Sequence, residues 1–276
     1  MTFPLYRPGD DPGPSFAELL RRSGSMPPAP GLAVEGVTHG TTVVAIRYAE
    51  GVVMAGDRRA TSGNLISHRT MEKVFPADRH SGVAIAGAAG PAMDMVRLFQ
   101  LQLEHYEKVE GVELSLEGKA NQLSGMVRNH LPAAMQGLAV VPLFAGYDTR
   151  RRAGRLFQYD VTGGRYEESG FATTGSGSLH AGTVIKMGYR EDLDRAATLD
   201  LAISALFNAA DEDSATGGPD LVRGIYPTMA TITDDGFTRV EEDEIAERFR
   251  ALVGRLATPD STTAAGPTPS IGGPLT

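Results

Sequence analysis

The spacing of hydrophobic positions changes several times along the chain, and each change predicts a different kind of element. Between residues 42–48 and 51–57, two β-branched runs lie on either side of Ala49-Glu50, which predicts a hairpin of two strands. In residues 91–109 and 115–135, apolar positions instead recur every three or four residues, the spacing of one helical face. The same reasoning predicts further strands at residues 65–67, 74–76, 82–87, 139–147, 155–161, 171–174, 224–231 and 236–240, and further helices at 178–188, 198–212 and 241–256.

The order of these elements indicates the fold class. Strands come mostly as hairpins, in groups separated by pairs of helices, and single strands do not alternate with single helices. This order favours antiparallel sheets with helices outside them, a layered α+β domain, over a doubly wound parallel fold. A chain of 276 residues is long enough for one large domain with a sizeable core.

The two ends of the chain differ in composition from this central region. Residues 1–40 contain many of the prolines, and they read as a loosely ordered leader. One short helix is expected within it at residues 15–22, because Ser15 and Glu18 form a capping-box pattern. Residues 257–276 are rich in Thr, Pro and Gly, so we expect a disordered tail there.

Composition excludes several functional classes. The chain has no cysteine, which rules out disulfides, thiolate nucleophiles and cysteine-based metal sites. A net charge of −8 disfavours a nucleic-acid-binding role, because phosphate neutralisation needs a surplus of Lys and Arg. Metal-ligand spacing among the histidines, phosphate-binding loops and the G-x-S-x-G elbow are all missing. No secretory signal or membrane-length apolar run occurs either, so we expect a soluble cytoplasmic protein.

The junction His39-Gly40-Thr41-Thr42 indicates a candidate nucleophile. A threonine with a free α-amino group can use that group as the base for its own hydroxyl. The unperturbed pKa of such an amine, about 7.7–8.0, leaves much of it neutral near pH 7. Gly40 has no Cβ, which would let the Thr41 hydroxyl approach the preceding carbonyl and cut the bond. Residues 1–40 would then be a propeptide, and Thr42 is expected to be only the first residue of a strand.

Several segments occur in the order found in proteasome β-subunits. These segments are G-T-T at residues 40–42, G-D-x-R-A-T at 56–61, MEKVF at 71–75, A-G-x-x-G at 86–90, G-S-G-S at 175–178 and D-x-x-S at 211–214. From Thr41 to about Arg250 the chain resembles these N-terminal-nucleophile hydrolases, and its long leader and tail resemble their actinobacterial branch. The resemblance implies a four-layer αββα sandwich of antiparallel sheets, with a peptidase domain over residues 41–256.

The resemblance also implies a catalytic centre. Thr41 matches the nucleophile, and Lys73 matches the lysine that favours loss of the hydroxyl proton and keeps the amine neutral. Asp57 matches the carboxylate that holds this lysine. Gly87 matches the glycine whose backbone N–H stabilises the oxyanion. Taken singly, the last three residues would read as a turn aspartate, a surface lysine and a turn glycine.

A second group of residues matches the family's support for the threonine amine. Ser176 matches the supporting serine, with Ser178 as an alternative close by. Asp211 and Ser214 match the supporting D-x-x-S pair. Two features of this segment depart from the pattern: Ala215 stands where glycine is usual, and Asp213 could replace Asp211 in the pair.

The resemblance implies where a substrate would bind. The pocket for the residue before the scissile bond would be lined by Ala60, Met71, Phe75, Ile85, Ala89 and Met93. Because this lining is apolar and uncharged, we expect a preference for hydrophobic residues there. Backbone groups of Thr61, Gly87 and Ala89 would hold the substrate as an extended strand.

The function implied is that of a threonine endopeptidase acting through an acyl-ester on Thr41. The family implies seven-membered β-rings stacked with rings of proteasome α-subunits in a 28-subunit barrel. Substrates would be unfolded polypeptides, tagged with a small ubiquitin-like protein and delivered by an ATPase ring. Neither nucleic acid nor membrane is implied as a partner, and no metal or organic cofactor is implied. The alternatives are a non-catalytic structural β-subunit, a small-amide amidohydrolase of the same fold, and the peptidase of a bacterial two-component ATP-dependent protease, which is shorter and lacks a long leader.

Overall fold

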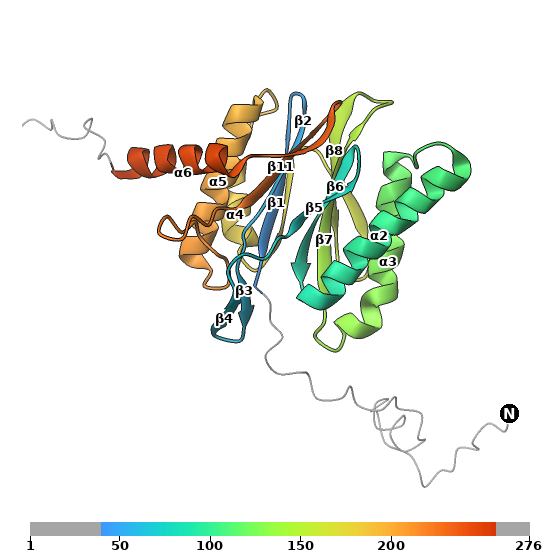
Figure 1. Ribbon diagram of the computed structural model, residues 1–276, viewed down its shortest axis with the longest axis horizontal. Coiled ribbons are helices and arrows are strands. Elements are labelled where there is room, and N and C mark those ends of the chain that lie inside the picture. The colour runs from blue at the N-terminus through green and yellow to red at the C-terminus, as the bar shows by residue number, and fades with distance from the viewer. Residues whose placement is uncertain (1–39, 258–276) are drawn as a thin grey trace, which may run out of the picture.

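Two sheets lie face to face between two layers of helices (Figure 1). The computed structural model describes residues 40–257, so the helix expected at residues 15–22 lies outside the described residues. The expected tail also lies outside this range, except for Ala257, which ends the last helix. The arrangement confirms the α+β fold class and the four-layer αββα sandwich.

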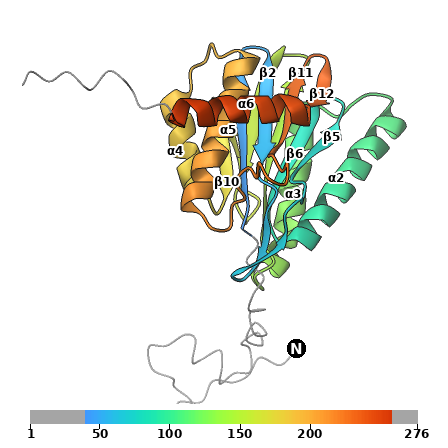
Figure 2. The same cartoon turned by 60° about the vertical axis from the view of Figure 1, so that its left-hand side comes forward.

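The first sheet contains the strand that begins next to Thr41. Its strands are β1 (Thr42–Tyr48), β2 (Gly51–Gly56), β10 (Phe171–Gly175), β11 (Thr228–Thr233) and β12 (Gly236–Arg239). They are antiparallel in the order β10-β1-β2-β11-β12. The helices on its outer face are α4 (Ser178–Gly188), α5 (Arg195–Glu212) and α6 (Glu242–Ala257). Figure 2 shows α6 running across α5 on this face.

The second sheet carries the other helical layer. Its strands are β5 (Val74–Asp78), β6 (Ser81–Gly87), β7 (Val140–Asp148), β8 (Ala153–Tyr159) and β9 (Arg165–Glu168), antiparallel in chain order. The helices α2 (Ala89–Glu110) and α3 (Leu116–Ala134) pack on its outer face. A separate hairpin of β3 (Ala60–Ser62) and β4 (Leu65–His68) extends beyond the sandwich near the start of β1 (Figure 1).

Three apolar clusters fill the three spaces between the four layers. Alternate residues of β1 divide between two of them: Val44 and Ile46 face α4, α5 and α6, whereas Val43 and Ala45 face the second sheet. A strand segment buried on both faces needs apolar residues at successive positions, which is why residues 43–46 of β1 are all apolar. The third cluster joins the second sheet to α2 and α3 and includes Phe144.

The structure differs from the expected elements at a few boundaries. The short strands β3 and β9 were not predicted from the sequence. Helix α5 begins at Arg195, three residues before the expected start, because the Asp194 side chain caps it by accepting a hydrogen bond from the Ala197 N–H at 2.7 Å. The strand expected from residue 224 begins only at Thr228.

Segments that are far apart in the sequence come together where β1 begins. Thr42 pairs with Gly175 of β10, and the Asp57 N–H after β2 donates to the Thr42 carbonyl at 3.1 Å. The turn from β10 into α4 and the loop after α5 also lie at the start of β1, where Gly177 and Thr216 contact the Thr42 hydroxyl. Within residues 40–257, no helix is both long and apolar enough to cross a membrane.

Candidate active site

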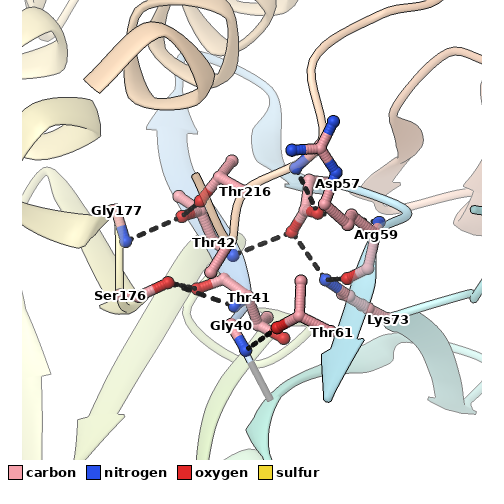
Figure 3. Close-up of polar contacts among 12 residues, drawn as sticks. Gly40, Thr41, Thr42, Asp57, Arg59, Thr61, Lys73, Ser176, Gly177 and Thr216 are labelled. Carbon is pink, nitrogen blue, oxygen red and sulfur yellow. Dashed lines mark hydrogen bonds and ion pairs between the residues drawn. The ribbon is translucent and has the colours of Figure 1, made fainter. Parts of the chain in front are cut away.

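Thr41 is held by its backbone between β1 and the turn that follows β10. The Ser176 N–H donates to the Thr41 carbonyl at 2.8 Å, and the Thr41 N–H donates to the Ser176 hydroxyl at 3.3 Å (Figure 3). This close approach requires glycine at position 175, which has a φ of +101° and whose Cβ would lie 1.8 Å from the Thr41 carbonyl oxygen. The Thr41 residue is only 4% exposed, so it starts the strand from within the molecule.

The carboxylate of Asp57 is completely buried and accepts four hydrogen bonds. One oxygen accepts from the Thr42 N–H at 2.8 Å and from the Lys73 ammonium at 2.7 Å (Figure 3). The other accepts from the N–H groups of Arg59 at 2.9 Å and Gly217 at 2.8 Å. Asp57 therefore connects Lys73 to the backbone of the residue next to Thr41.

Lys73 is the largest side chain that is almost completely buried, at 1% exposure. Its Nζ also donates to the Arg59 carbonyl at 2.6 Å, so the ammonium has two oxygen acceptors. Burial lowers the pKa of Lys73 below its usual 10.5, and the nearby Asp57 carboxylate offsets part of this effect. A lysine with a lowered pKa releases a proton more readily than a surface lysine, and perturbed groups of this kind are common in catalytic sites.

A second polar network lies on the other side of Thr41. The hydroxyls of Ser176 and Thr216 both donate to one oxygen of Asp213, at 2.5 and 2.6 Å. Thr216 also contacts the Thr42 hydroxyl at 2.5 Å (Figure 3). Burial by itself would raise the pKa of Asp213, but the hydrogen bonds from Ser176, Thr216 and the Ala215 N–H lower it on balance. Asp213 is therefore an anion near neutral pH.

Gly40 is buried against the loop that follows α5. Its N–H donates to the Thr61 hydroxyl at 3.3 Å (Figure 3). A Cβ at this position would lie 1.8 Å from the Cβ of Ala215, closer than atoms can approach. Glycine is thus the residue that fits directly before Thr41.

These groups together could support hydrolysis of an amide bond. The site combines a threonine hydroxyl, a buried lysine with a lowered pKa, and a serine held by a carboxylate beside the Thr41 nitrogen. Ser176 is exposed, whereas Thr41 beside it is buried. No group of three His, Cys, Asp or Glu side chains in residues 40–257 is placed to bind a metal ion.

Comparison with known proteins identifies the family. The family model described as "Proteasome subunit" matches residues 37–222. The chain therefore belongs to the proteasome family. A "Proteasome subunit beta" of Acidimicrobium ferrooxidans is 57% identical over 250 residues, which cover 90% of this chain and 92% of the relative. Relatives of the same description are 59% identical in Streptomyces griseus, over 90% of this chain and 88% of the relative, and 54% identical in Acidothermus cellulolyticus, over 95% and 93%.

The structure brings together four of the seven residues that the resemblance to proteasome β-subunits indicated as catalytic. Thr41, Asp57, Lys73 and Ser176 are linked by the contacts described above. Ser178, the alternative to Ser176, instead begins α4, and its carbonyl accepts a hydrogen bond from Thr173. Ser176 is thus the serine that lies beside Thr41.

Gly87 lies at the end of β6 in a conformation that only glycine adopts easily. Its φ is +115°, and a Cβ there would lie 2.0 Å from the Ala139 carbonyl oxygen. The following N–H, of Ala88, donates to the same carbonyl at 2.8 Å. The need for glycine at position 87 therefore follows from the close approach of β7, whatever its role toward a substrate.

The D-x-x-S pair is displaced by two residues from its expected position. Asp211 lies in the last turn of α5 and is exposed. Ser214 follows the helix and is also exposed. The residue that contacts Ser176 is Asp213, where the helix ends, and Thr216 donates to the same carboxylate oxygen. The spacing of the D-x-x-S pattern is kept when the pattern starts at Asp213, and Thr216 then stands in the place of the expected serine.

Thr42 and Gly217 were not predicted to belong to the site, yet both are part of it. The Thr42 hydroxyl is completely buried and hydrogen-bonded, so Thr42 is more than the first residue of a strand. Gly217 donates its N–H to Asp57. Neither contact leaves a local signal in the sequence, because each joins segments more than 130 residues apart.

The residues expected to line a substrate pocket differ in their place in the fold and in how far they are buried. Phe75 and Met93 pack against the cluster that contains Ile85, between the second sheet and its helices. Ile85 is only 3% exposed and is therefore a core residue. Ala60 and Thr61 lie in the separate hairpin and are buried, whereas Met71 and Ala89 are half-buried.

Proposed function

We propose that this chain is a catalytic β-subunit of a cytoplasmic proteasome, a threonine endopeptidase whose nucleophile is Thr41. The observation that carries the proposal is the buried Asp57 carboxylate, which holds both Lys73 and the backbone next to Thr41. A non-catalytic subunit would have no need for a buried lysine with a lowered pKa. Membership in the proteasome family and the close similarity to β-type relatives support the same function.

The first reaction is removal of the leader, residues 1–40. The Thr41 hydroxyl oxygen bonds to the Gly40 carbonyl carbon as the peptide C–N bond breaks, and the hydroxyl proton goes to the departing nitrogen. Water then hydrolyses the resulting ester, which leaves Gly40 with a carboxylate and Thr41 with a free hydroxyl and a free amine. Residues 41–256 would then be the mature peptidase domain, with the remaining residues as a tail.

The second reaction repeats this chemistry on a substrate. The Thr41 amine accepts the hydroxyl proton while the oxygen attacks the scissile carbonyl carbon, and the Lys73 ammonium favours the developing negative charge. The proton passes to the departing substrate amine, and water hydrolyses the acyl-ester on Thr41. The Gly87 backbone N–H is proposed to stabilise the oxyanion.

The same proposal includes the substrates and the partners. Phe75 and Met93, which are only partly buried, offer an uncharged apolar lining, which favours hydrophobic residues before the scissile bond. The chain would assemble with other β-subunits and with α-subunits in stacked rings. Unfolded polypeptides, delivered by an ATPase ring and tagged with a small ubiquitin-like protein, would be its substrates.

The test is to determine the N-terminus and the activity of the assembled protein. The wild type is expected to begin at Thr41 and to cleave a fluorogenic peptide with a hydrophobic residue before the reporter. Thr41→Ala is expected to keep its leader and to cleave nothing, whereas the control Thr162→Ala, in the turn after β8, behaves as wild type. A Thr41→Ala variant that still cleaves would refute the proposal. Cleavage of small amides only, without ring assembly, would instead favour the amidohydrolase.

A further inference from the structure

The hydroxyl of Thr42 lies at the end of the polar network that reaches Thr41. Thr42 is 0% exposed, and its Oγ1 accepts a hydrogen bond from the Gly177 N–H at 3.0 Å. The same oxygen lies 2.5 Å from the Thr216 hydroxyl. Position 177 must be glycine for this pair to fit, because a Cβ there would lie 2.4 Å from Thr42 Oγ1 and 2.8 Å from Thr216 Oγ1.

The direction of each proton in this network follows from Asp213. An ionised carboxylate only accepts hydrogen bonds, so the hydroxyl protons of Ser176 and Thr216 both point to Asp213. Thr216 has a single hydroxyl proton, so the proton between Thr42 and Thr216 must come from Thr42. The hydrogen bonds therefore run in one direction, from the Gly177 N–H through Thr42 and Thr216 to Asp213.

The Ser176 hydroxyl has two possible acceptors, the Asp213 carboxylate at 2.5 Å and the Thr41 carbonyl at 3.4 Å. The shorter, charged contact takes its single proton, so toward the Thr41 N–H at 3.3 Å the Ser176 oxygen acts as an acceptor. Ser176 is exposed, and without this arrangement its hydroxyl would turn freely and exchange partners with water. The Thr42 hydroxyl also anchors Gly177, the residue directly after Ser176.

We infer that Thr42 is a positioning residue for the amine of Thr41, because its hydroxyl holds Gly177 and thereby the turn that carries Ser176. The inference rests on the proposed function, in which this amine is the base. An amine that gives one N–H to a fixed acceptor cannot rotate about its N–Cα bond. Its lone pair is then held in one direction, which fixes where it can receive the hydroxyl proton.

The test compares Thr42→Val, which keeps the shape of the side chain and removes the hydroxyl, with Thr42→Ser, which keeps the hydroxyl. Thr198→Val is the matched control, because Thr198 is also 0% exposed and its hydroxyl donates to the Asp194 carbonyl at 2.7 Å, outside this network. The full-length chains are assembled, their leader removal is followed by mass spectrometry, and active sites are titrated with a peptidyl boronate, which adds to hydroxyl nucleophiles. Rates are then expressed per active site.

For Thr42→Val we expect kcat per active site to fall about tenfold or more, with KM within about twofold, because Thr42 does not touch the substrate. The acidic limb of the pH profile is expected to move, since the turn that carries Ser176 loses its anchor at Gly177 and Ser176 no longer holds the Thr41 N–H in one direction. Thr42→Ser and Thr198→Val are expected to keep kcat within about threefold of the wild type. A Thr42→Val chain that folds with an unchanged Tm but keeps its leader would also support the inference, because Ser176 accepts the same N–H before cleavage.

An unchanged kcat per site and an unchanged pH profile in Thr42→Val would overturn the inference, even if the Tm falls, since Thr42 would then only fill space. A loss of kcat as large in Thr42→Ser as in Thr42→Val would also overturn it, because the hydroxyl would not be the cause. Failure of the proposed function has a different signature, which is cleavage by Thr41→Ala or no cleavage by the wild type.

Discussion

Replacing Asp57 with asparagine is expected to destabilise the protein more than removing its partner Lys73. The Asp57 carboxylate accepts two hydrogen bonds at each oxygen, all from N–H donors. An asparagine presents an NH₂ group in place of one oxygen, so two buried donors face another donor whichever way the amide turns. With the NH₂ turned toward Lys73, its ammonium keeps only the Arg59 carbonyl as an acceptor, and with the NH₂ turned away the N–H groups of Arg59 and Gly217 lose theirs.

Removing the charge of Lys73 leaves a less unfavourable arrangement. In Lys73→Met, the Asp57 carboxylate keeps three backbone N–H donors, from Thr42, Arg59 and Gly217. Breaking a buried ion pair so that one charge is left without a counter-charge costs about 3–5 kcal/mol, which we expect for Asp57→Asn. We expect about 1–3 kcal/mol for Lys73→Met, the range for losing one buried hydrogen-bonding partner.

The assay is thermal unfolding of both variants in the same oligomeric state. For a domain of this size 1 kcal/mol corresponds to about 2–4 °C, so the Tm of Asp57→Asn is expected to lie about 4–8 °C below that of Lys73→Met. Glu72→Gln is the control: Glu72 forms an exposed ion pair with Arg239, and its loss should cost less than about 1 kcal/mol. If the Tm of Lys73→Met fell as far as that of Asp57→Asn, or further, the reasoning would be refuted, since the three N–H groups would then not compensate for the missing ammonium.

The pH dependence gives a second check on the same pair. Burial places the pKa of Lys73 below its unfolded value of 10.5. Between these two values the unfolded chain binds more protons, so stability rises with pH in this window. Without the Asp57 charge the pKa of Lys73 falls further, and the defect of Asp57→Asn should therefore shrink as the pH is raised. A defect that stays constant up to pH 10 would contradict this.

Three further predictions follow from single contacts. Gly40→Ala should slow leader removal, followed by mass spectrometry, because its Cβ would lie 1.8 Å from that of Ala215; normal processing would show that the loop yields easily. Asp213→Asn should lower peptide turnover about tenfold or more, while Asp211→Asn stays within about twofold of the wild type. A larger loss in Asp211→Asn than in Asp213→Asn would instead indicate that the D-x-x-S pair is Asp211 and Ser214, as first expected. Glu244 joins α5 to α6, and hydrogen bonds from Arg195 lower its pKa from 4.5 to about 2. Its stabilising contribution is complete above pH 4.5 and lost as the pH falls toward 2, so Glu244→Gln should flatten the decline of the Tm over this range; parallel declines in both proteins would count against it.

Elements with strong local patterns were predicted close to their observed boundaries. The residues of β1 and α4 match the expected ranges, because a β-branched run and a helical spacing each act within a few residues. The short strand β9 was missed, since a strand of four residues with polar side chains depends on pairing with β8. Its pattern on its own does not distinguish it from a loop.

The D-x-x-S pair shows where local reasoning stops. Asp211 and Asp213 lie in the same short stretch, and the sequence offers both as candidates. What separates them is the end of α5: Asp211 is still helical and faces solvent, whereas Asp213 lies where the chain leaves the helix and turns back toward Ser176. The choice was therefore made by the path of the loop.

By itself, the sequence determined the order of the elements and the layered α+β class, because these depend on residue types and short spacings. The Gly40-Thr41 junction indicated Thr41 by its chemistry, whereas Asp57 and Lys73 were indicated only by the resemblance to proteasome β-subunits. Only the tertiary structure decided which serine, aspartate and threonine lie beside Thr41. It also decided that the Thr42 hydroxyl belongs to the site, since the partners of Thr42 lie 135 and 174 residues further along the chain. Contacts over such distances arise when the turns after β10 and α5 are brought to the start of β1, and no short pattern contains that information.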